Sequence, residues 1–280
     1  MTNQNLPGQV AVVTGAGGTL CSVIAEDLAR RGAAVALLGR TASKLQTVAD
    51  RIANEGGRSL VCVADVKDIN ALRHARTEVR RAFGECSILI NGAGGNQADA
   101  ITATTEFTPD ELDKPETRGF FNLDMAAFGR VVEANIMGTV KPCQVFGEDM
   151  ARNGKGVIIN FASMNSYRPL SKVGAYGAAK AGVCSFTQWL ACYLAPAGVR
   201  VNAIAPGFFV NDRSRKLLFA RDGRYSPRGE QVLRHTPMKR FGEAAELLGC
   251  LNWLIDDQAA GFVTGITVPV DGGFLSSSGL

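Results

Sequence analysis

The sequence has little histidine, and its cysteines show no metal-binding spacing. Only 2 histidines, His74 and His235, occur among the 280 residues, so a His-ligated zinc site or a Ser-His-Asp triad has little support. The 7 cysteines include no C-x-x-C pair, which indicates free thiols in a reducing compartment. We therefore expect a cytoplasmic protein that holds no metal.

Long apolar runs and blocks of like charge are also missing. No apolar stretch approaches the roughly 20 residues that span a bilayer, and residues 1–10 (MTNQNLPGQV) lack the apolar core of a signal peptide. The net charge is +4, but the basic residues are scattered along the chain. We therefore expect a soluble protein whose partners include neither a membrane nor a nucleic acid.

Short apolar runs alternate with helical patterns along the whole chain. Each run is apolar on both faces, which is typical of strands buried in a parallel sheet. The predicted strands are 10–13, 34–38, 60–63, 87–90, 156–161, 199–204 and 266–270, and the predicted helices are 19–31, 42–55, 69–83, 125–152, 174–196 and 243–256. This alternation predicts an α/β fold: one Rossmann-type domain over 1–280 with a doubly wound parallel sheet of about seven strands.

Two stretches, 96–124 and 207–240, do not fit the alternation. Both are polar or rich in Arg, Gly and Pro, and both follow a predicted strand. Loops of this length in a compact domain are usually functional or disordered, and ligands bind at the carboxyl ends of strands in open α/β sheets. We expect these insertions to form the substrate side of the domain, although 96–124 could equally contact another subunit.

A serine, a tyrosine and a lysine stand close together in the segment 160–180, NFASMNSYRPLSKVGAYGAAK. Tyr176 and Lys180 are four residues apart, so a helix places them on one face. Ser163 follows a buried strand, thirteen residues before the tyrosine. A nearby ammonium favours phenolate, so we expect Lys180 to lower the pKa of Tyr176 and fit it for proton transfer.

This arrangement resembles the active site of the short-chain dehydrogenase/reductase family, and further motifs extend the resemblance over nearly the whole chain. These motifs are T-G at 14–15, A-D-V at 64–66, N-G-A-G at 91–94, Asn135, N-A-I-A-P-G at 202–207 and V-D-G-G at 270–273. The resemblance implies an NAD(P)-dependent dehydrogenase acting on CH-OH groups. It further implies that Ser163 holds the substrate oxygen, that the positive nicotinamide ring acts with Lys180 to lower the pKa of Tyr176, that Lys180 also binds the nicotinamide ribose, and that Asn135 holds a water for proton relay.

The phosphate-binding turn departs from the family pattern T-G-x-x-x-G-x-G, because Thr19 and Cys21 replace two glycines. Glycines in the turn still permit positive φ and close backbone approach, and helix-opening amides bind phosphate. We expect Cys21 to push the helix slightly away from the first strand, and a mere tight turn is the alternative. The residues expected at the pyrophosphate are Gly15, Gly17, Gly18, Thr19 and Leu20.

The second strand ends in Gly39 and Arg40, where an acidic residue would bind the ribose of NAD. A guanidinium suits a 2′-phosphate, so the sequence favours NADP(H), with NAD(H) as the alternative if Arg40 stacks on adenine. We expect Asp65 and Val66 at the adenine. The further residues expected at the cofactor, besides Tyr176 and Lys180, are Asn91, Gly92, Ala93, Gly94, Pro206, Gly207 and Phe209.

Within the family, the turn G-G-T-L-C and the segments F-A-S-M-N-S-Y-R-P and H-T-P-M-K-R-F-G resemble the branch of D-mannonate oxidoreductases, or fructuronate reductases. This implies D-fructuronate and D-mannonate as substrates, and we expect Asn165, Arg168 and Asn96 to contact them. Another sugar, polyol or 3-oxoacyl substrate is an alternative, and so is a non-catalytic NADP-binding regulator. The resemblance also implies a homodimer or homotetramer, paired through the helices 125–152 and 174–196.

Overall fold

A seven-stranded parallel sheet forms the centre of the protein, with the strand order β3-β2-β1-β4-β5-β6-β7. The computed structural model describes residues 6–114 and 116–277. The strands are β1 (Val10–Thr14), β2 (Ala34–Gly39), β3 (Arg58–Val63), β4 (Ile88–Asn91), β5 (Gly156–Phe161), β6 (Val199–Pro206) and β7 (Thr267–Val270). This topology confirms the predicted fold, a single doubly wound α/β domain.

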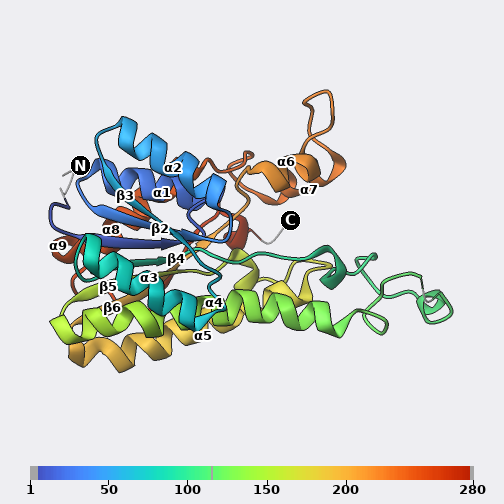
Figure 1. The fold of residues 1–280 in the computed structure, drawn as a ribbon. Helices are drawn as coiled ribbons and strands as arrows, with labels where there is room; N and C mark the ends of the chain where they lie inside the picture. The colour runs from blue at the N-terminus through green and yellow to red at the C-terminus, as the bar shows by residue number, and fades with distance from the viewer. Residues whose placement is uncertain (1–5, 115, 278–280) are drawn as a thin grey trace.

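Helices cover both faces of the sheet. The helices that the structure describes are α1 (Thr19–Arg30), α2 (Ala42–Asn54), α3 (Ile69–Ala82), α4 (Met125–Asn153), α5 (Gly174–Leu194), α6 (Asp212–Leu218), α7 (Pro227–His235), α8 (Leu248–Ile255) and α9 (Asp257–Ala260). Helices α1, α2 and α8 pack against one face, and α3, α4 and α5 pack against the other (Figure 1). Alternate residues of β1 supply both cores, because successive side chains of a strand point to opposite faces.

The two segments outside the alternation project from the same end of the sheet, beyond the carboxyl ends of the strands (Figure 1). Residues 96–124 form an extended arm that contains two short 3-10 helices, Ala98–Ala100 and Pro109–Leu112. Residues 207–240 are not a plain loop, since they contain α6 and α7. The fold therefore brings both insertions to the sheet edge where parallel α/β sheets bind ligands.

Helix α7 has start and stop signals that the periodicity of the sequence did not reveal. Ser226 caps it, with its hydroxyl accepting the N–H of Gly229 at 3.1 Å, and Pro227 occupies the first helical position. Arg234 and His235 lie in the last turn, where positive charge favours a helix end. The helix is only nine residues long and contains Pro227 and Gly229, two residue types with low helix propensity.

Candidate active site

Ser163, Tyr176 and Lys180 come together where β5 ends and α5 begins. Ser163 caps the 3-10 helix Met164–Ser166, and its hydroxyl accepts the N–H of Asn165 at 3.1 Å. The Lys180 ammonium nitrogen donates to the Phe161 carbonyl at 2.6 Å and lies 5.8 Å from the centre of the Tyr176 ring. One strand end and the first two turns of one helix thus supply all three side chains.

Burial controls the charges of this cluster. It raises the pKa of the Tyr176 phenol, against the opposing effect of a hydrogen bond with Ser163. Burial also lowers the pKa of Lys180 to about 8. In the protein chain alone, removal from water favours the neutral form of both groups, so the expected lowering of the phenol pKa stays a prediction for the complex with the positive nicotinamide ring.

Asn135, which is fully buried in α4, clamps the loop that follows β4. Its amide nitrogen donates to the Gly95 carbonyl at 2.7 Å and to the Val131 carbonyl at 2.8 Å, and its amide oxygen accepts the Gly95 N–H at 3.1 Å. A Cβ on Gly94 would lie 2.5 Å from this oxygen and 3.5 Å from the Lys180 nitrogen. Asn135 therefore positions a glycine loop beside Lys180.

The glycine turn between β1 and α1 is open to an anion. The N-cap residue of α1 is Gly18, so no side chain at this position accepts the first N–H groups of the helix. The first turn of the helix contains no acidic residue. Gly15 has a φ of +69°, and a Cβ there would lie 3.0 Å from the Ala93 backbone. Unpaired amides at a helix start attract phosphate, so this turn fits the pyrophosphate of a dinucleotide.

Cys21, in place of a glycine, packs directly against the turn after β4. The side chain is 4% exposed, and a Cβ on Gly92 would lie 2.1 Å from its sulfur. The thiol therefore fills the space that a side chain at residue 92 would need. Burial raises the pKa of this thiol to about 12, so it is an inert packing group rather than a nucleophile.

The residues expected near the adenine lie beyond the ends of β2 and β3. Arg40 is exposed, one oxygen of Asp65 accepts the Lys67 N–H at 2.9 Å, and Val66 is buried. The sequence reasoning missed Lys44, in the first turn of α2. A Cβ on Gly17 would lie 2.9 Å from the Lys44 Cβ, so this lysine packs against the glycine turn. The signal in the sequence was its position in the first turn of the helix that follows the second strand.

Asn91, expected at the cofactor, has its side chain in a buried network of hydrogen bonds between the sheet and α5. Its amide nitrogen donates to Asn160 at 2.9 Å, and the Asn160 amide donates to Thr187 at 2.9 Å. This network joins β4, β5 and α5, and the sequence reasoning did not identify Asn160 or Thr187. The Asn91 side chain is 1% exposed, and its amide oxygen has no hydrogen-bond partner among the described residues.

The end of β6 meets the turn after β7. The Gly207 N–H donates to the Val270 carbonyl at 2.9 Å, and a Cβ on Gly207 would lie 2.6 Å from the Asp271 Cα. Phe209 is buried, and both it and Val270 line a cavity of about 380 Å³. Pro206 and Gly207 therefore stand at a tight junction between the sheet and the C-terminal turn.

Arg168, expected at the substrate, binds the C-terminal segment instead of projecting freely. Its guanidinium donates to the carbonyls of Phe274, Leu275 and Ser277 at 3.4, 3.4 and 2.6 Å. These bonds tie the segment after Ser163 to the end of the chain. They also occupy several of the donors that a substrate carboxylate would need.

The two asparagines expected at the substrate also have backbone partners. The amide oxygen of Asn165 accepts the Leu170 N–H at 2.7 Å, and the side chain is 4% exposed. The amide oxygen of Asn96 accepts the Gln97 N–H at 2.9 Å. The geometry thus gives Asn165 a part in shaping the loop before α5.

Two kinds of feature are absent from the described ranges 6–114 and 116–277. There, no three His, Cys, Asp or Glu side chains gather in a way that could hold a metal ion. None of the helices in the same ranges is both long and apolar enough to cross a bilayer.

Comparison with known proteins places this geometry in a family. Residues 9–219 match the short chain dehydrogenase family. An uncharacterized oxidoreductase of Bacillus subtilis, UxuB, is 45% identical over 99% of both chains.

Two solved structures extend the comparison. A Haemophilus influenzae protein assigned as a D-mannonate oxidoreductase, solved with NAD, is 43% identical over 99% of both chains, with a TM-score of 0.94. A gluconate 5-dehydrogenase of Burkholderia cenocepacia, solved with NADP and tartrate, is 27% identical over 99% of this chain and 100% of its own, with a TM-score of 0.81. The chain belongs to the short-chain dehydrogenase family and is an NAD(P)-dependent oxidoreductase.

Proposed function

We propose that this oxidoreductase interconverts D-mannonate and D-fructuronate, by moving hydride between the sugar-acid carbon and a nicotinamide. The observation that carries the proposal is similarity over the whole chain to the Haemophilus influenzae protein assigned as a D-mannonate oxidoreductase. The cluster of Ser163, Tyr176 and Lys180 supports the reaction type, because a carbonyl accepting hydride needs a proton at its oxygen.

The phenol of Tyr176 donates this proton in the direction of reduction. Burial raises its pKa, so the phenol holds its proton at neutral pH. Ser163 binds the substrate oxygen and stabilises its developing negative charge. Oxidation runs the reverse way: Tyr176 first gives its own proton to the neutral amine of Lys180, and the resulting phenolate then takes the proton of the alcohol oxygen as hydride leaves the carbon. A bound nicotinamide supplies or takes the hydride.

Lys180 passes the proton between Tyr176 and water. Its pKa of about 8 lets the amine change charge near neutral pH, which suits a relay. The Gly94–Gly95 loop that Asn135 holds lies beside the Lys180 nitrogen. We assign the relay water to this place, and the hydroxyls of the nicotinamide ribose to Lys180.

The cofactor lies along the carboxyl ends of β1, β2, β3, β4 and β6 in this proposal. The turn at Gly15, Gly17 and Gly18, with the amides of Thr19 and Leu20, binds the pyrophosphate. The residues after the other strands are Arg40 at the adenosine ribose, Asp65 and Val66 at adenine, and Asn91, Gly92, Ala93, Gly94, Pro206, Gly207 and Phe209 at the ribose and nicotinamide.

For the nucleotide, we propose a preference for NADP(H) over NAD(H). The exposed Arg40 follows β2 with no carboxylate at the strand end, and Lys44 packs nearby on Gly17. The Haemophilus structure holds NAD and the Burkholderia structure holds NADP, so related proteins differ. Arg40→Ala should raise KM for NADPH by about tenfold and leave KM for NADH unchanged, since one charge-assisted contact contributes about 1.5–3 kcal/mol. An equal change for both nucleotides contradicts the preference.

A substrate panel tests the function. Purified protein is incubated with NAD or NADP and with D-mannonate, its epimer D-gluconate, a neutral polyol or a 3-hydroxyacyl thioester, and reduced nicotinamide is followed by absorbance. We expect the highest kcat/KM with D-mannonate, and loss of that activity in Tyr176→Phe. A higher kcat/KM for another alcohol overturns the substrate, and cofactor binding without any turnover indicates a regulator.

We also propose a homodimer or homotetramer that pairs through α4 and α5. These helices pack side by side on one face of the sheet, and α5 exposes the stacked rings of Trp189 and Tyr193, 5.2 Å apart. Trp189 is 58% exposed and Tyr193 is 68% exposed, which is unusual for large aromatic groups unless they meet a partner. Light scattering of the wild type and of Trp189→Ser tests this, and a monomeric wild type contradicts it.

A further inference from the structure

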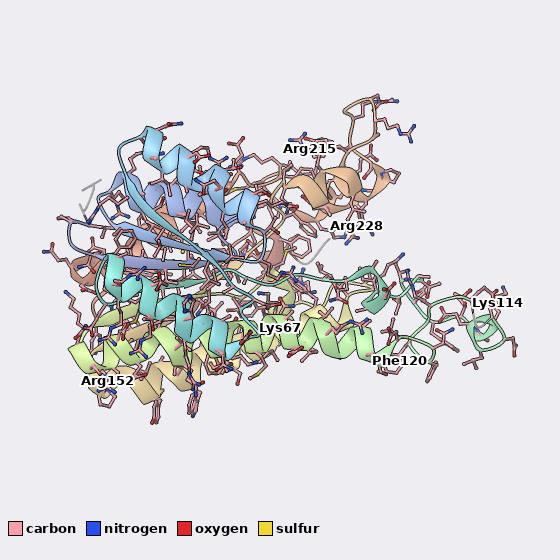
Figure 2. The ribbon with its side chains drawn as sticks, in the orientation of Figure 1. Lys67, Lys114, Phe120, Arg152, Arg215 and Arg228 are labelled. Atoms are coloured by element: carbon pink, nitrogen blue, oxygen red, sulfur yellow. The ribbon has the colours of Figure 1, made fainter. Side chains whose placement is uncertain are left out.

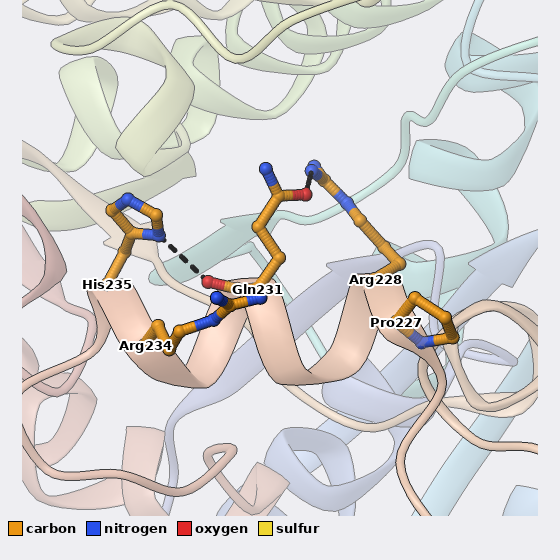
Figure 3. Close-up of a pocket in the computed structure, with 5 residues that line it drawn as sticks. All are labelled: Pro227, Arg228, Gln231, Arg234 and His235. Carbon is orange, nitrogen blue, oxygen red and sulfur yellow. Dashed lines mark hydrogen bonds between the residues drawn. The ribbon is translucent and has the colours of Figure 1, made fainter.

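The exposed face of α7 gathers positive and polar side chains around a depression. Arg228, Gln231, Arg234 and His235, with Pro227, line a space of about 380 Å³ (Figure 3). Spacings of three and four residues place these side chains on one side of the helix. The volume is within the usual range for small-molecule sites, roughly 300–1,000 Å³.

Bonds within the cluster orient these side chains and leave donors unused. The Arg228 guanidinium donates to the Gln231 amide oxygen at 3.0 Å, so the Gln231 amide nitrogen remains a donor. A ring nitrogen of His235 lies 2.8 Å from the Gln231 carbonyl (Figure 3). Among the residues that the structure describes, no carboxylate forms an ion pair with Arg228 or Arg234. Two guanidinium groups therefore have no ion-pair partner within 4.0 Å among these residues, and Glu230 is the one carboxylate that α7 itself carries.

This face is turned toward the other insertion, and the end of the helix packs on the C-terminal turn. Figure 2 shows Arg228 on the side of α7 that is turned toward the arm 96–124. At the other end of the helix, Thr236 packs on the C-terminal turn, since a Cβ on Gly272 would lie 3.0 Å from its methyl group. Arg168, just after Ser163, holds the next residues of that turn through the Phe274 carbonyl. One packed layer thus joins α7 to the segment that follows the catalytic serine.

Other cations near the catalytic serine are already engaged. The Arg168 guanidinium donates to three carbonyls of the C-terminal segment. The Lys172 ammonium donates to the Ala103 carbonyl at 2.6 Å. A carboxylate entering between the two insertions would therefore meet its free donors on α7, where Arg228 and Arg234 present planar guanidinium groups that bind carboxylates in pairs of hydrogen bonds.

We propose that Arg228, Gln231 and Arg234 form the subsite for the carboxylate of an anionic substrate, at the entrance of the active site. This inference rests on the proposed function and names the part of the molecule that selects acids over neutral alcohols. Attraction of opposite charges also concentrates the substrate at the cleft, so KM for an acid should rise with ionic strength.

The test compares an acid with a neutral alcohol in the variants Arg228→Gln, Arg234→Gln and the double substitution. We expect KM for D-mannonate to rise at least about tenfold in the double variant, because each arginine makes a charge-assisted contact. The value of kcat, KM for a neutral alcohol and KM for the cofactor should stay within about twofold of the wild type. Arg224→Gln is the matched control, since Arg224 is exposed before α7 and paired with Asp222.

A second measurement separates failure of the subsite from failure of the proposed substrate. Hexonates such as D-gluconate are tested as competitive inhibitors of neutral-alcohol oxidation. Inhibition that the double variant loses supports the subsite, even where D-mannonate is not oxidised. Turnover of D-mannonate with an unchanged KM in the double variant overturns the subsite and leaves the proposed function standing. A wild type that oxidises neutral alcohols without hexonate inhibition also overturns the subsite.

Discussion

The catalytic cluster of Ser163, Tyr176 and Lys180 (the floor) and the exposed segments around it (the rim) differ in how their side chains are held. On the floor, Ser163, Tyr176 and Lys180 belong to the junction of β5 and α5, and Ser163 and Lys180 are 7% and 4% exposed. On the rim, the arm 96–124 carries Phe120 and Phe121, which are 67% and 72% exposed. Buried side chains held by a strand end and a helix keep the geometry that the reaction needs. Exposed segments around them can change in sequence, so they can determine which substrate binds.

The largest effect should come from the floor. Ser163→Ala removes the hydroxyl that binds the substrate oxygen, so we expect kcat to fall by about 10²–10³. Stopped-flow or steady-state absorbance of the nicotinamide measures this. Ser166→Ala is the matched control, because its hydroxyl accepts the Ser163 backbone N–H at 3.3 Å and is assigned no contact with the substrate. An equal fall in kcat in the two variants would show that Ser163 only supports the local structure and does not bind the substrate oxygen.

Lys180 links the floor to stability. Its pKa falls from 10.5 to about 8 on folding, so the unfolded chain holds the proton more firmly between these values. The contribution of Lys180 to the free energy of unfolding is therefore lowest below pH 8. It rises by about 3 kcal/mol in all as the pH increases toward 10.5.

Lys180→Met should remove this dependence. Relative to the wild type, the variant should be most stable below pH 8 and should lose that advantage as pH rises through the window. Urea unfolding on either side of the window measures the difference. An unchanged difference between the two proteins across the window would show that the amine titrates normally in the folded protein.

The contact between Cys21 and Gly92 allows a rescue experiment under the cofactor turn. Gly92→Ala should destabilise the protein by about 1–3 kcal/mol, because its Cβ would lie 2.1 Å from the Cys21 sulfur. Cys21→Ala in the same chain should restore most of this loss, since the Cys21 Cβ lies at an ordinary 3.7 Å. Thermal unfolding of the single and double variants forms a double-mutant cycle, and additive effects would contradict the contact.

The smallest effect concerns the rim. Arg168→Ala removes the bonds to the carbonyls of Phe274, Leu275 and Ser277, and should cost about 1 kcal/mol because the region is partly exposed. Hydrogen exchange should quicken at the amides of the C-terminal turn. Arg152→Ala, an exposed arginine of α4 paired with Glu148, is the control that should leave these amides unchanged.

The sequence predicts most of the fold and the proximity of Ser163, Tyr176 and Lys180. Strand ends are marked by apolar runs, and the spacing of Tyr176 and Lys180 is a helical period, so their proximity follows from local structure. The strand limits agree within two residues, as for Arg58–Val63 against the predicted 60–63. Local periodicity was sufficient wherever one element, or two consecutive ones, supplied the geometry.

The rest depends on contacts between distant segments. The chain of Asn91, Asn160 and Thr187 joins residues up to 69 positions apart, and no local pattern marks such a bond. Arg168 lies beside the catalytic serine in sequence, yet its partners are more than 100 residues away. The direction of the Tyr176 pKa shift also depended on burial, which the pattern Y-x-x-x-K does not contain.

The most direct test of the account is the kcat of Tyr176→Phe with saturating cofactor, on the alcohol that the wild type oxidises best. We predict a fall of at least about 10³ with the affinity for the nucleotide unchanged, because only the proton-transferring hydroxyl is lost. A kcat within about twofold of the wild type would contradict the central claim that the half-buried Tyr176 phenol carries the proton.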